Sequence, residues 1–179
     1  MKKAFLVLLI TLICSSFAFT QMGNSGPLLT SIGQSPDAEL IRVLLTRQGI
    51  PFQLNPLATS ADLRAADEIL VLVIGGSSKG LGAAGISADD ELARTRALIT
   101  RARELNMQII AVHIGGEDRR GALSDGFINY AVPLADQVIV VSTGNADGLF
   151  TSLAGGAGIP LQSVARINDV GTPLAAVLR

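Results

Sequence analysis

Residues 71–87, VLVIGGSSKGLGAAGIS, run from an apolar segment directly into a segment rich in glycine and serine. Similar apolar runs occur at 69–74, 109–112 and 138–141, and none of them alternates apolar with polar residues. A continuous apolar run indicates a strand that is covered on both faces. A helical pattern from Ser87 to about Asn106 separates two of these runs, so strands and helices alternate along the chain.

This alternation predicts a three-layer α/β domain with a mostly parallel sheet of five or six strands. The flavodoxin-like strand order 2-1-3-4-5 is favoured, with the sixth strand at an edge, and a Rossmann order is the alternative. The remaining strands are predicted at 28–32, 51–54 and 161–164. The remaining helices are predicted to start at Ser35-Pro36-Asp37, at Asn145 and at Asp169.

Several local details are also predicted. In the helix after Ser87, Ser87 and Asp90 have the spacing of a capping box, and Asp90 and Arg94 have that of an i,i+4 ion pair. The helix after Asn145 is expected to break near Gly155–Gly156, and the last helix to be interrupted by Pro173.

The first residues have the pattern of a secretory signal. Lys2 and Lys3 precede an apolar core that is too short to span a bilayer, and Ser16-Phe17-Ala18 supplies small residues for cleavage. We therefore predict a signal peptide at 1–18, a flexible leader at 19–27 and one α/β domain at 28–179. The protein is expected to be secreted or periplasmic, without a stable membrane anchor.

Composition limits the chemistry of the mature chain. Cleavage of 18 of the 179 residues leaves 161, removes the only cysteine, and takes the net charge from −1 to −3. A chain without basic excess and with few aromatic residues is not expected to bind nucleic acid. One histidine and no mature cysteine argue against a zinc site, and no metal or other cofactor is predicted. Glu117, Asp118, Asp125 and Asp147 could gather around Mg²⁺ or Ca²⁺, but Asp125 and Asp147 fit better as acids at helix starts.

The glycine turn at 76–82 resembles the nucleotide-binding turn of short-chain dehydrogenases, but the rest of that family's pattern is absent. A complete strand–helix–strand unit precedes the turn, and the following strand ends at His113 rather than at an acidic residue. The only tyrosine, Tyr130, has Leu134 where the catalytic lysine would stand. We therefore reject this assignment.

The same segment contains G-x-S-x-G, which would make Ser78 the nucleophile of a serine hydrolase. The only histidine, His113, comes one strand later rather than near the end of the chain. Neighbouring strands could still bring Ser78, or Ser77, close to His113 or Lys79. No complete catalytic constellation is found, so a secreted serine hydrolase remains an alternative function.

Residues that could recognise a ligand concentrate at the carboxyl ends of the predicted strands. Glycines and hydroxyl groups gather there, together with the sole mature lysine and the sole histidine. We therefore predict that a small polar or anionic molecule binds at this edge. His113 is expected to contact an anionic ligand, so that affinity rises as pH falls, unless it is only a structural cap. The predicted binding residues are Ser35, Gly75, Gly76, Ser77, Ser78, Lys79, His113, Arg119, Arg120, Ser124 and Asn145. An interaction module without a small ligand is the third possibility, and protein partners are not predicted.

Long motif blocks resemble a family of secreted bacterial proteins known only as a domain of unknown function. The blocks are TSIGQSPDAELIRVLL, VIGGSSKGLGAAGI, HIGGEDRRGALSDGFI and GNADGLFT, and the resemblance covers nearly the whole mature chain. It implies an exported α/β domain and carries over no activity, substrate, cofactor or catalytic residue.

Overall fold

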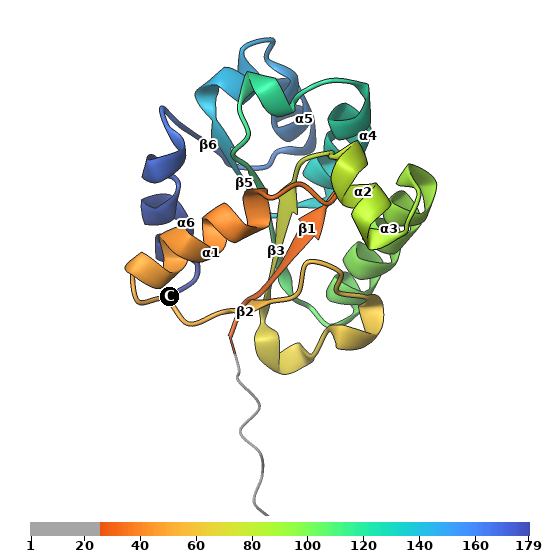
Figure 1. Cartoon of the computed structure of the whole chain (residues 1–179). Coiled ribbons are helices and arrows are strands. Elements are labelled where there is room, and N and C mark those ends of the chain that lie inside the picture. The colour runs from red at the N-terminus through yellow and green to blue at the C-terminus, as the bar shows by residue number, and fades with distance from the viewer. Residues whose placement is uncertain (1–25) are drawn as a thin grey trace, which may run out of the picture.

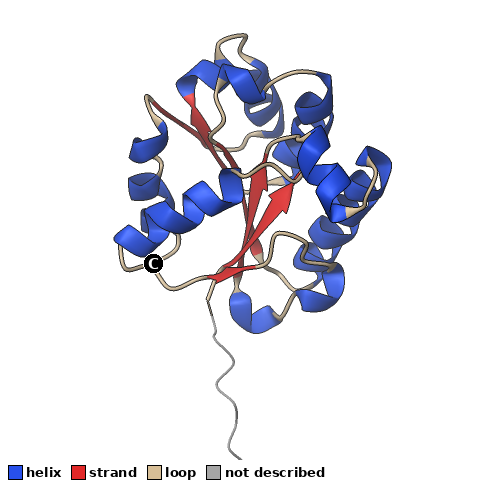
Figure 2. Ribbon diagram, in the orientation of Figure 1, coloured by secondary structure: helices blue, strands red, loops and turns tan. Residues whose placement is uncertain are grey.

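The computed structural model describes residues 26–179, so most of the predicted signal peptide and leader lies outside the described residues. Six strands form one parallel sheet in the order β2-β1-β3-β4-β5-β6 (Figures 1 and 2). This confirms the predicted α/β class and the flavodoxin-like order. The strands are β1 (Leu28–Ile32), β2 (Gln53–Leu54), β3 (Ile69–Ile74), β4 (Gln108–His113), β5 (Gln137–Val141) and β6 (Leu161–Val164).

Helices cover both faces of the sheet (Figure 1). The α-helices are α1 (Asp37–Arg47), α2 (Ser78–Ala84), α3 (Ala88–Glu104), α4 (Ala122–Ala131), α5 (Leu149–Ala157) and α6 (Gly171–Val177). Short 3₁₀ turns are η1 (Ser60–Asp62), η2 (Ala65–Asp67), η3 (Glu117–Arg119), η4 (Val132–Leu134), η5 (Ser142–Asn145) and η6 (Ile167–Asp169). Helices α1 and α6 pack on one face, while α3, α4 and α5 pack on the other. Within residues 26–179, no helix is long and apolar enough to cross a membrane.

The central strands β3, β4 and β5 are largely apolar because each contributes to two hydrophobic cores. In β3, Leu70, Leu72 and Ile74 pack under α3, α4 and α5. The alternate residues Val71 and Val73 pack under α1 and α6. Successive side chains of a strand point to opposite faces, so a strand in the middle layer needs an apolar residue at every position.

The start of α3 confirms one predicted contact and corrects another. The Ser87–Asp90 capping box is present. The predicted Asp90–Arg94 ion pair is wrong, because Arg94 instead pairs with Glu91 at 2.7 Å. The carboxylate of Asp90 accepts a hydrogen bond from the Ser87 hydroxyl. Glu91 is fully buried, and its carboxylate also accepts a hydrogen bond from the Gly33 amide at 2.7 Å. The pair therefore anchors the loop after β1.

Arg94 completes this anchor through backbone carbonyl groups of two distant segments. It donates to the carbonyl oxygen of Ala58 at 2.6 Å and to that of Ser31. The hydroxyl of Thr30 is also within hydrogen-bond distance, at 3.3 Å. These contacts offset the free-energy cost of burying the charged guanidinium of Arg94.

The two C-terminal helices differ from the sequence predictions. Helix α5 begins at Leu149, continues through Gly155 and Gly156 to Ala157, and is capped by Gly158, which has a left-handed φ of 69°. Helix α6 is not interrupted by Pro173, because this residue lies in its first turn, where a backbone N–H has no partner within the helix. The glycine-rich segment after β3, for which the sequence predicts a turn, contains the short helix α2.

Candidate functional site

The parallel sheet brings the loops after β1, β3, β4 and β5 to one edge, as the sequence predicted (Figure 1). The loops after β1 and β3 are joined by backbone hydrogen bonds rather than separated by a crevice. The amide of Ser35 donates to the carbonyl oxygen of Gly75 at 3.1 Å, and that of Ser77 donates to Gly33 at 2.8 Å. Ser35 is buried beside this junction.

The paired glycines 75 and 76 permit close packing at this junction. A Cβ on Gly75 would lie 2.7 Å from the Ser35 hydroxyl, and one on Gly76 would lie 2.7 Å from Leu123. The Gly76 amide donates to the hydroxyl of the buried Ser124 at 2.8 Å. Contacts within the protein thus explain why Ser35, Gly75, Gly76 and Ser124 stand at these positions, without a role in ligand binding.

The residues of the G-x-S-x-G segment do not meet as a catalytic group. Ser77 caps α2, because its hydroxyl accepts a hydrogen bond from the Gly80 amide at 3.0 Å. Ser78 and Lys79 are exposed on the first turn of α2. Among residues 26–179 neither side chain has a hydrogen bond or ion pair.

His113 is fully buried at the end of β4. Its Nδ1 lies 2.9 Å from the carbonyl oxygen of Ile74, and its Nε2 lies 3.3 Å from that of Gly116. The ring also packs against Phe150, with the two centroids 5.2 Å apart. Both ring nitrogens thus face backbone carbonyl oxygens rather than Ser78, and the ring borders none of the cavities described below. This placement favours the structural cap over contact with a ligand.

Arg120 is held between two carboxylates. It lies 2.7 Å from Asp125 and 2.8 Å from Asp147, and it also donates to the carbonyl oxygen of Gly144. Hydrogen bonds that Arg120 donates to Asp147 and Asp125 raise the pKa of Arg120 above its ordinary value. The hydrogen bond with Arg120, and then that with the Leu149 amide, lower the pKa of Asp147 to about 2. The charge of Arg120 is therefore neutralised within the protein.

The acidic residues considered for Mg²⁺ or Ca²⁺ do not converge on a cation site. A small cavity of about 250 Å³ does bring Glu117, Asp125 and Asp147 together, but Arg120 lies among them. Within residues 26–179, no cluster of three or more His, Cys, Asp or Glu residues could hold a metal ion.

Asn145 supports the start of α5. Its side-chain oxygen accepts hydrogen bonds from the amides of Phe150, at 2.8 Å, and Thr151, at 3.3 Å. Its side-chain nitrogen donates to the Thr151 hydroxyl. Asn145 therefore acts as a helix cap placed four residues before α5, which explains why the predicted helix began too early.

Arg119 lies at the junction between the loop after β4 and the start of α1. Its Nε is 3.8 Å from Oδ2 of Asp37, which is too long for a hydrogen bond. Both atoms are buried and have no hydrogen-bond partner among the described residues. Unlike Arg120, Arg119 thus has a buried donor whose hydrogen bonding is incomplete within the described residues.

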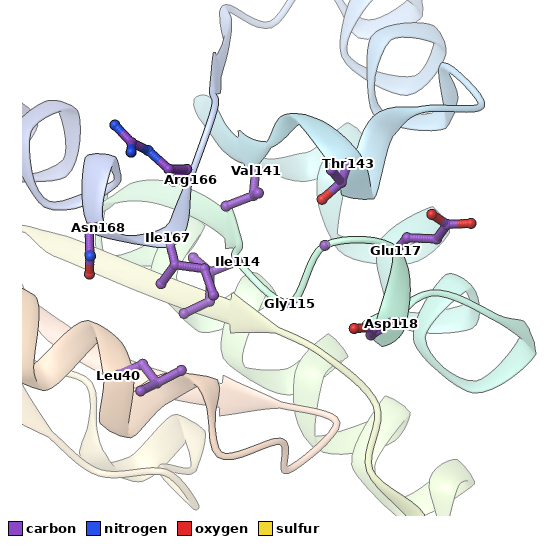
Figure 3. A pocket seen from close by; sticks show the side chains of 11 residues that line it. Leu40, Ile114, Gly115, Glu117, Asp118, Val141, Thr143, Arg166, Ile167 and Asn168 are labelled. Atoms are coloured by element: carbon purple, nitrogen blue, oxygen red, sulfur yellow. The ribbon is translucent and has the colours of Figure 1, made fainter.

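A cleft of about 710 Å³ lies beside this junction, at the carboxyl ends of β4, β5 and β6. Its apolar side chains come from α1, from the ends of β4 and β5, and from η6, and they lie close together in Figure 3. They are Leu40, Ile114, Val141 and Ile167. The polar lining residues are Glu117, Asp118, Thr143, Arg166 and Asn168.

The charged groups of the cleft stand at its rim. Figure 3 shows the carboxylate of Glu117 and the guanidinium of Arg166 directed away from the apolar side chains, on opposite sides of the cleft. Arg166 lies 3.5 Å from Asp169, whereas Glu117 and Asp118 have no ion-pair partner within residues 26–179. The rim therefore carries an excess of negative charge on the side of η3.

The sequence predicted two of the loops that form this cleft, but none of the predicted binding residues lines it. The loop 114–118 contributes its glycines and acids rather than Arg119 and Arg120, and the loop after β5 contributes Thr143 rather than Asn145. Leu40 is 44% exposed, although the helix pattern around it predicts apolar residues only on the buried face. A leucine on the otherwise polar face of this helix was the feature of the sequence that could have indicated a lining residue. The segment 166–168 offered no such feature, because its sequence does not distinguish a segment that lines a cleft from an ordinary loop.

The chain belongs to a family described as a domain of unknown function (DUF6305), since the family model matches residues 25–178. This confirms the resemblance to such a domain. Among curated proteins, none matches the chain.

Proposed function

We propose that this member of the family binds a small molecule in the cleft bounded by Leu40, Ile114, Val141 and Ile167. One observation carries the proposal: a cleft of about 710 Å³ with an apolar floor stands at the carboxyl edge of the parallel sheet. Binding sites for small molecules typically enclose roughly 300–1,000 Å³ and are mostly apolar. In parallel α/β sheets they lie beyond the carboxyl ends of the strands.

The charges around the cleft favour a neutral or cationic ligand over an anionic one. Arg120 is neutralised by Asp125 and Asp147, and Lys79 lies on α2, outside the cleft. Glu117 and Asp118 remain unpaired within the described residues, at the rim. We therefore expect a ligand with an apolar body and a hydroxyl, amide or ammonium group that faces η3. The sequence predicted a small polar or anionic ligand, and the charges of the cleft favour a polar ligand over an anionic one.

Export is a second part of the proposal and rests on the sequence alone. Lys2, Lys3, the short apolar core and Ala18 support cleavage by a signal peptidase. Mass spectrometry of the mature protein from its own host tests this. Cleavage after Ala18 is expected, and a mature chain that retains Lys2 and Lys3 in the cytoplasm would contradict it.

Fluorescence titration with 1-N-phenylnaphthylamine, a neutral apolar probe, tests binding in the cleft. The chain offers closely matched control residues, because Leu40 and Leu57 are both 44% exposed, while Ile167 and Leu134 are 37% and 38% exposed. Leu40→Asp and Ile167→Asp should each weaken probe binding about tenfold or more, since a charge then faces the apolar floor. Leu57→Asp and Leu134→Asp lie outside the cleft and should leave binding unchanged.

The proposal fails if the wild-type protein does not bind the probe at all. It also fails if the cleft variants and the control variants weaken binding equally, because the probe would then adhere to the surface non-specifically.

A further inference from the structure

The 3₁₀ turn η3 lies between two neighbouring parts of the fold, and two consecutive arginines connect it to them. On one side, Arg120 donates to the Gly144 carbonyl oxygen and pairs with Asp147, which ties η3 to the segment after β5. On the other side, Arg119 approaches Asp37 of α1. The first connection is made by complete hydrogen bonds, whereas the second is an ion pair with a gap of 3.8 Å.

The Asp37–Arg119 pair joins two walls of the proposed binding cleft. Asp37 begins α1, and Leu40, one turn later in the same helix, lines the cleft. Arg119 directly follows Asp118, which lines the opposite wall. A change in the Asp37–Arg119 distance therefore changes the separation of Leu40 from η3.

Glycines at two positions keep this contact possible. A Cβ on Gly115 would lie 2.1 Å from Cβ of Arg119 and 3.1 Å from Oδ2 of Asp37. A Cβ on Gly75 would lie 2.8 Å from the same carboxylate oxygen. Any larger residue at either position would push the arginine or the carboxylate out of place.

The unsatisfied atoms indicate that the pair can shorten. The Asp37 side chain is only 4% exposed, and neither its Oδ2 nor the Arg119 Nε has a hydrogen-bond partner among the described residues. A buried polar atom without a partner is unfavourable, and a charge-assisted hydrogen bond has a length of about 2.7–2.9 Å. A shift of about 1 Å would form that bond and draw η3 toward α1.

We propose that Asp37 and Arg119 are positioning residues that set the width of the cleft. The pair holds η3 against α1 in the free protein and shortens when a molecule fills the cleft. The effect on ligand binding rests on the proposed function, but the effect on cleft width does not.

A ligand-independent measurement tests the width directly. Val141 lines the cleft and is 4% exposed, and Cys14 is the only cysteine of the chain. In a Cys14→Ser background, the reaction rate of Val141→Cys with N-ethylmaleimide reports how often the cleft opens. Asp37→Asn and Arg119→Met should each raise this rate roughly 3- to 10-fold, and the double variant should raise it no further, because both remove the same interaction.

The exposed Glu39–Arg42 pair provides the control on the same helix. Glu39→Gln and Arg42→Met should leave the rate unchanged. If Asp37→Asn and Arg119→Met leave the rate unchanged while the proteins remain folded by circular dichroism, or if their effects simply multiply, the proposal is overturned. A purely structural pair would lower the melting temperature without this coupled change in rate.

A second titration with 1-N-phenylnaphthylamine separates the two proposals. Loss of the pair should weaken probe binding roughly 3- to 10-fold, again without additivity between the two substitutions. If the wild-type protein fails to bind the probe but the thiol rates change as expected, the proposed function fails and the positioning role stands. If the probe binds in a manner that depends on Leu40 but the thiol rates do not change, the positioning role fails alone.

Discussion

At the scale of single residues, Glu91 is the most deeply buried carboxylate among residues 26–179. Its side chain is fully buried, and it receives hydrogen bonds from Arg94, Gly33 and Gln34. Removing one member of a buried, hydrogen-bonded ion pair leaves the other charge without compensation. The loop after β1, which meets the loop after β3 at the carboxyl edge of the sheet, depends on this carboxylate.

Glu91→Ala should therefore lower the free energy of unfolding by about 3 kcal/mol or more. Glu104→Ala is the matched control, because it removes an exposed carboxylate from the same helix, where Arg101 is its partner at 3.0 Å. That substitution should change stability by about 1 kcal/mol or less. Urea denaturation of both variants checks the difference, and equal losses would contradict the role given to Glu91.

The Arg120–Asp147 pair predicts a dependence of stability on pH. Its hydrogen bonds lower the pKa of Asp147 in the folded protein to about 2, from an ordinary value of 3.8. Because the folded-state pKa is depressed, the stabilisation is fully present above about pH 4 and is lost as pH falls towards 2. Thermal denaturation should show wild type more stable than Asp147→Asn near pH 5, with a difference that shrinks as pH falls to 2.

Two comparisons check that Arg120 causes this difference. In an Arg120→Met background, Asp147→Asn should produce a smaller pH-dependent gap, because the hydrogen bond with the Leu149 amide then still lowers the pKa of Asp147. Because Asp147 is exposed, added salt should also narrow the gap in the wild-type background. A gap that stayed constant from pH 5 to pH 2 would contradict the assignment.

At the scale of elements, α5 shows that glycine inside a helix is tolerated when the flanking structure fixes its ends. Asn145 caps its start, and Gly158 ends it in the left-handed conformation. Gly155 and Gly156 lie within the helix, and a Cβ on either would meet no atom within 4 Å. The sequence prediction gave too much weight to the weak helix propensity of these glycines and too little to the caps and the buried Phe150.

Gly155→Ala and Gly156→Ala should therefore each stabilise the protein by about 0.5–1 kcal/mol, because alanine loses less backbone entropy in a helix. Gly158→Ala should instead destabilise it by about 1 kcal/mol, since its φ of 69° is unfavourable for residues with a Cβ. Melting temperatures of the three variants check the sign. Destabilisation by all three would mean that α5 ends before Gly155.

At the scale of the whole molecule, the strand order and the meeting of four loops at the carboxyl edge of the sheet followed from the sequence, but the lining of the cleft did not. Unbroken apolar runs such as 69–74 can only be buried on both faces, and this determines the three layers. Parallel strands then bring their carboxyl ends together without further information.

Side chains at that edge could not be placed in this way, because glycine, serine and arginine serve packing as readily as binding. Gly76 and Ser124 bind each other, Ser77 caps a helix, and Arg120 is enclosed by acids. The Gly76–Ser124 contact and the Arg120–Asp147 pair join residues far apart in the sequence, and no local pattern reveals them. The exposed Leu40, by contrast, is a lining residue that sequence reasoning could have found.

Chemical-shift mapping by NMR shows whether a small molecule binds in the cleft beside η3. Uniformly ¹⁵N-labelled protein would be titrated with 1-N-phenylnaphthylamine. The account predicts that the largest shifts fall on the amides of residues 115–118, 141–143 and 166–168, and that Leu40→Asp abolishes them. Shifts centred instead on Ser78, Lys79 and the start of α2, or no saturable shifts at all, would contradict it.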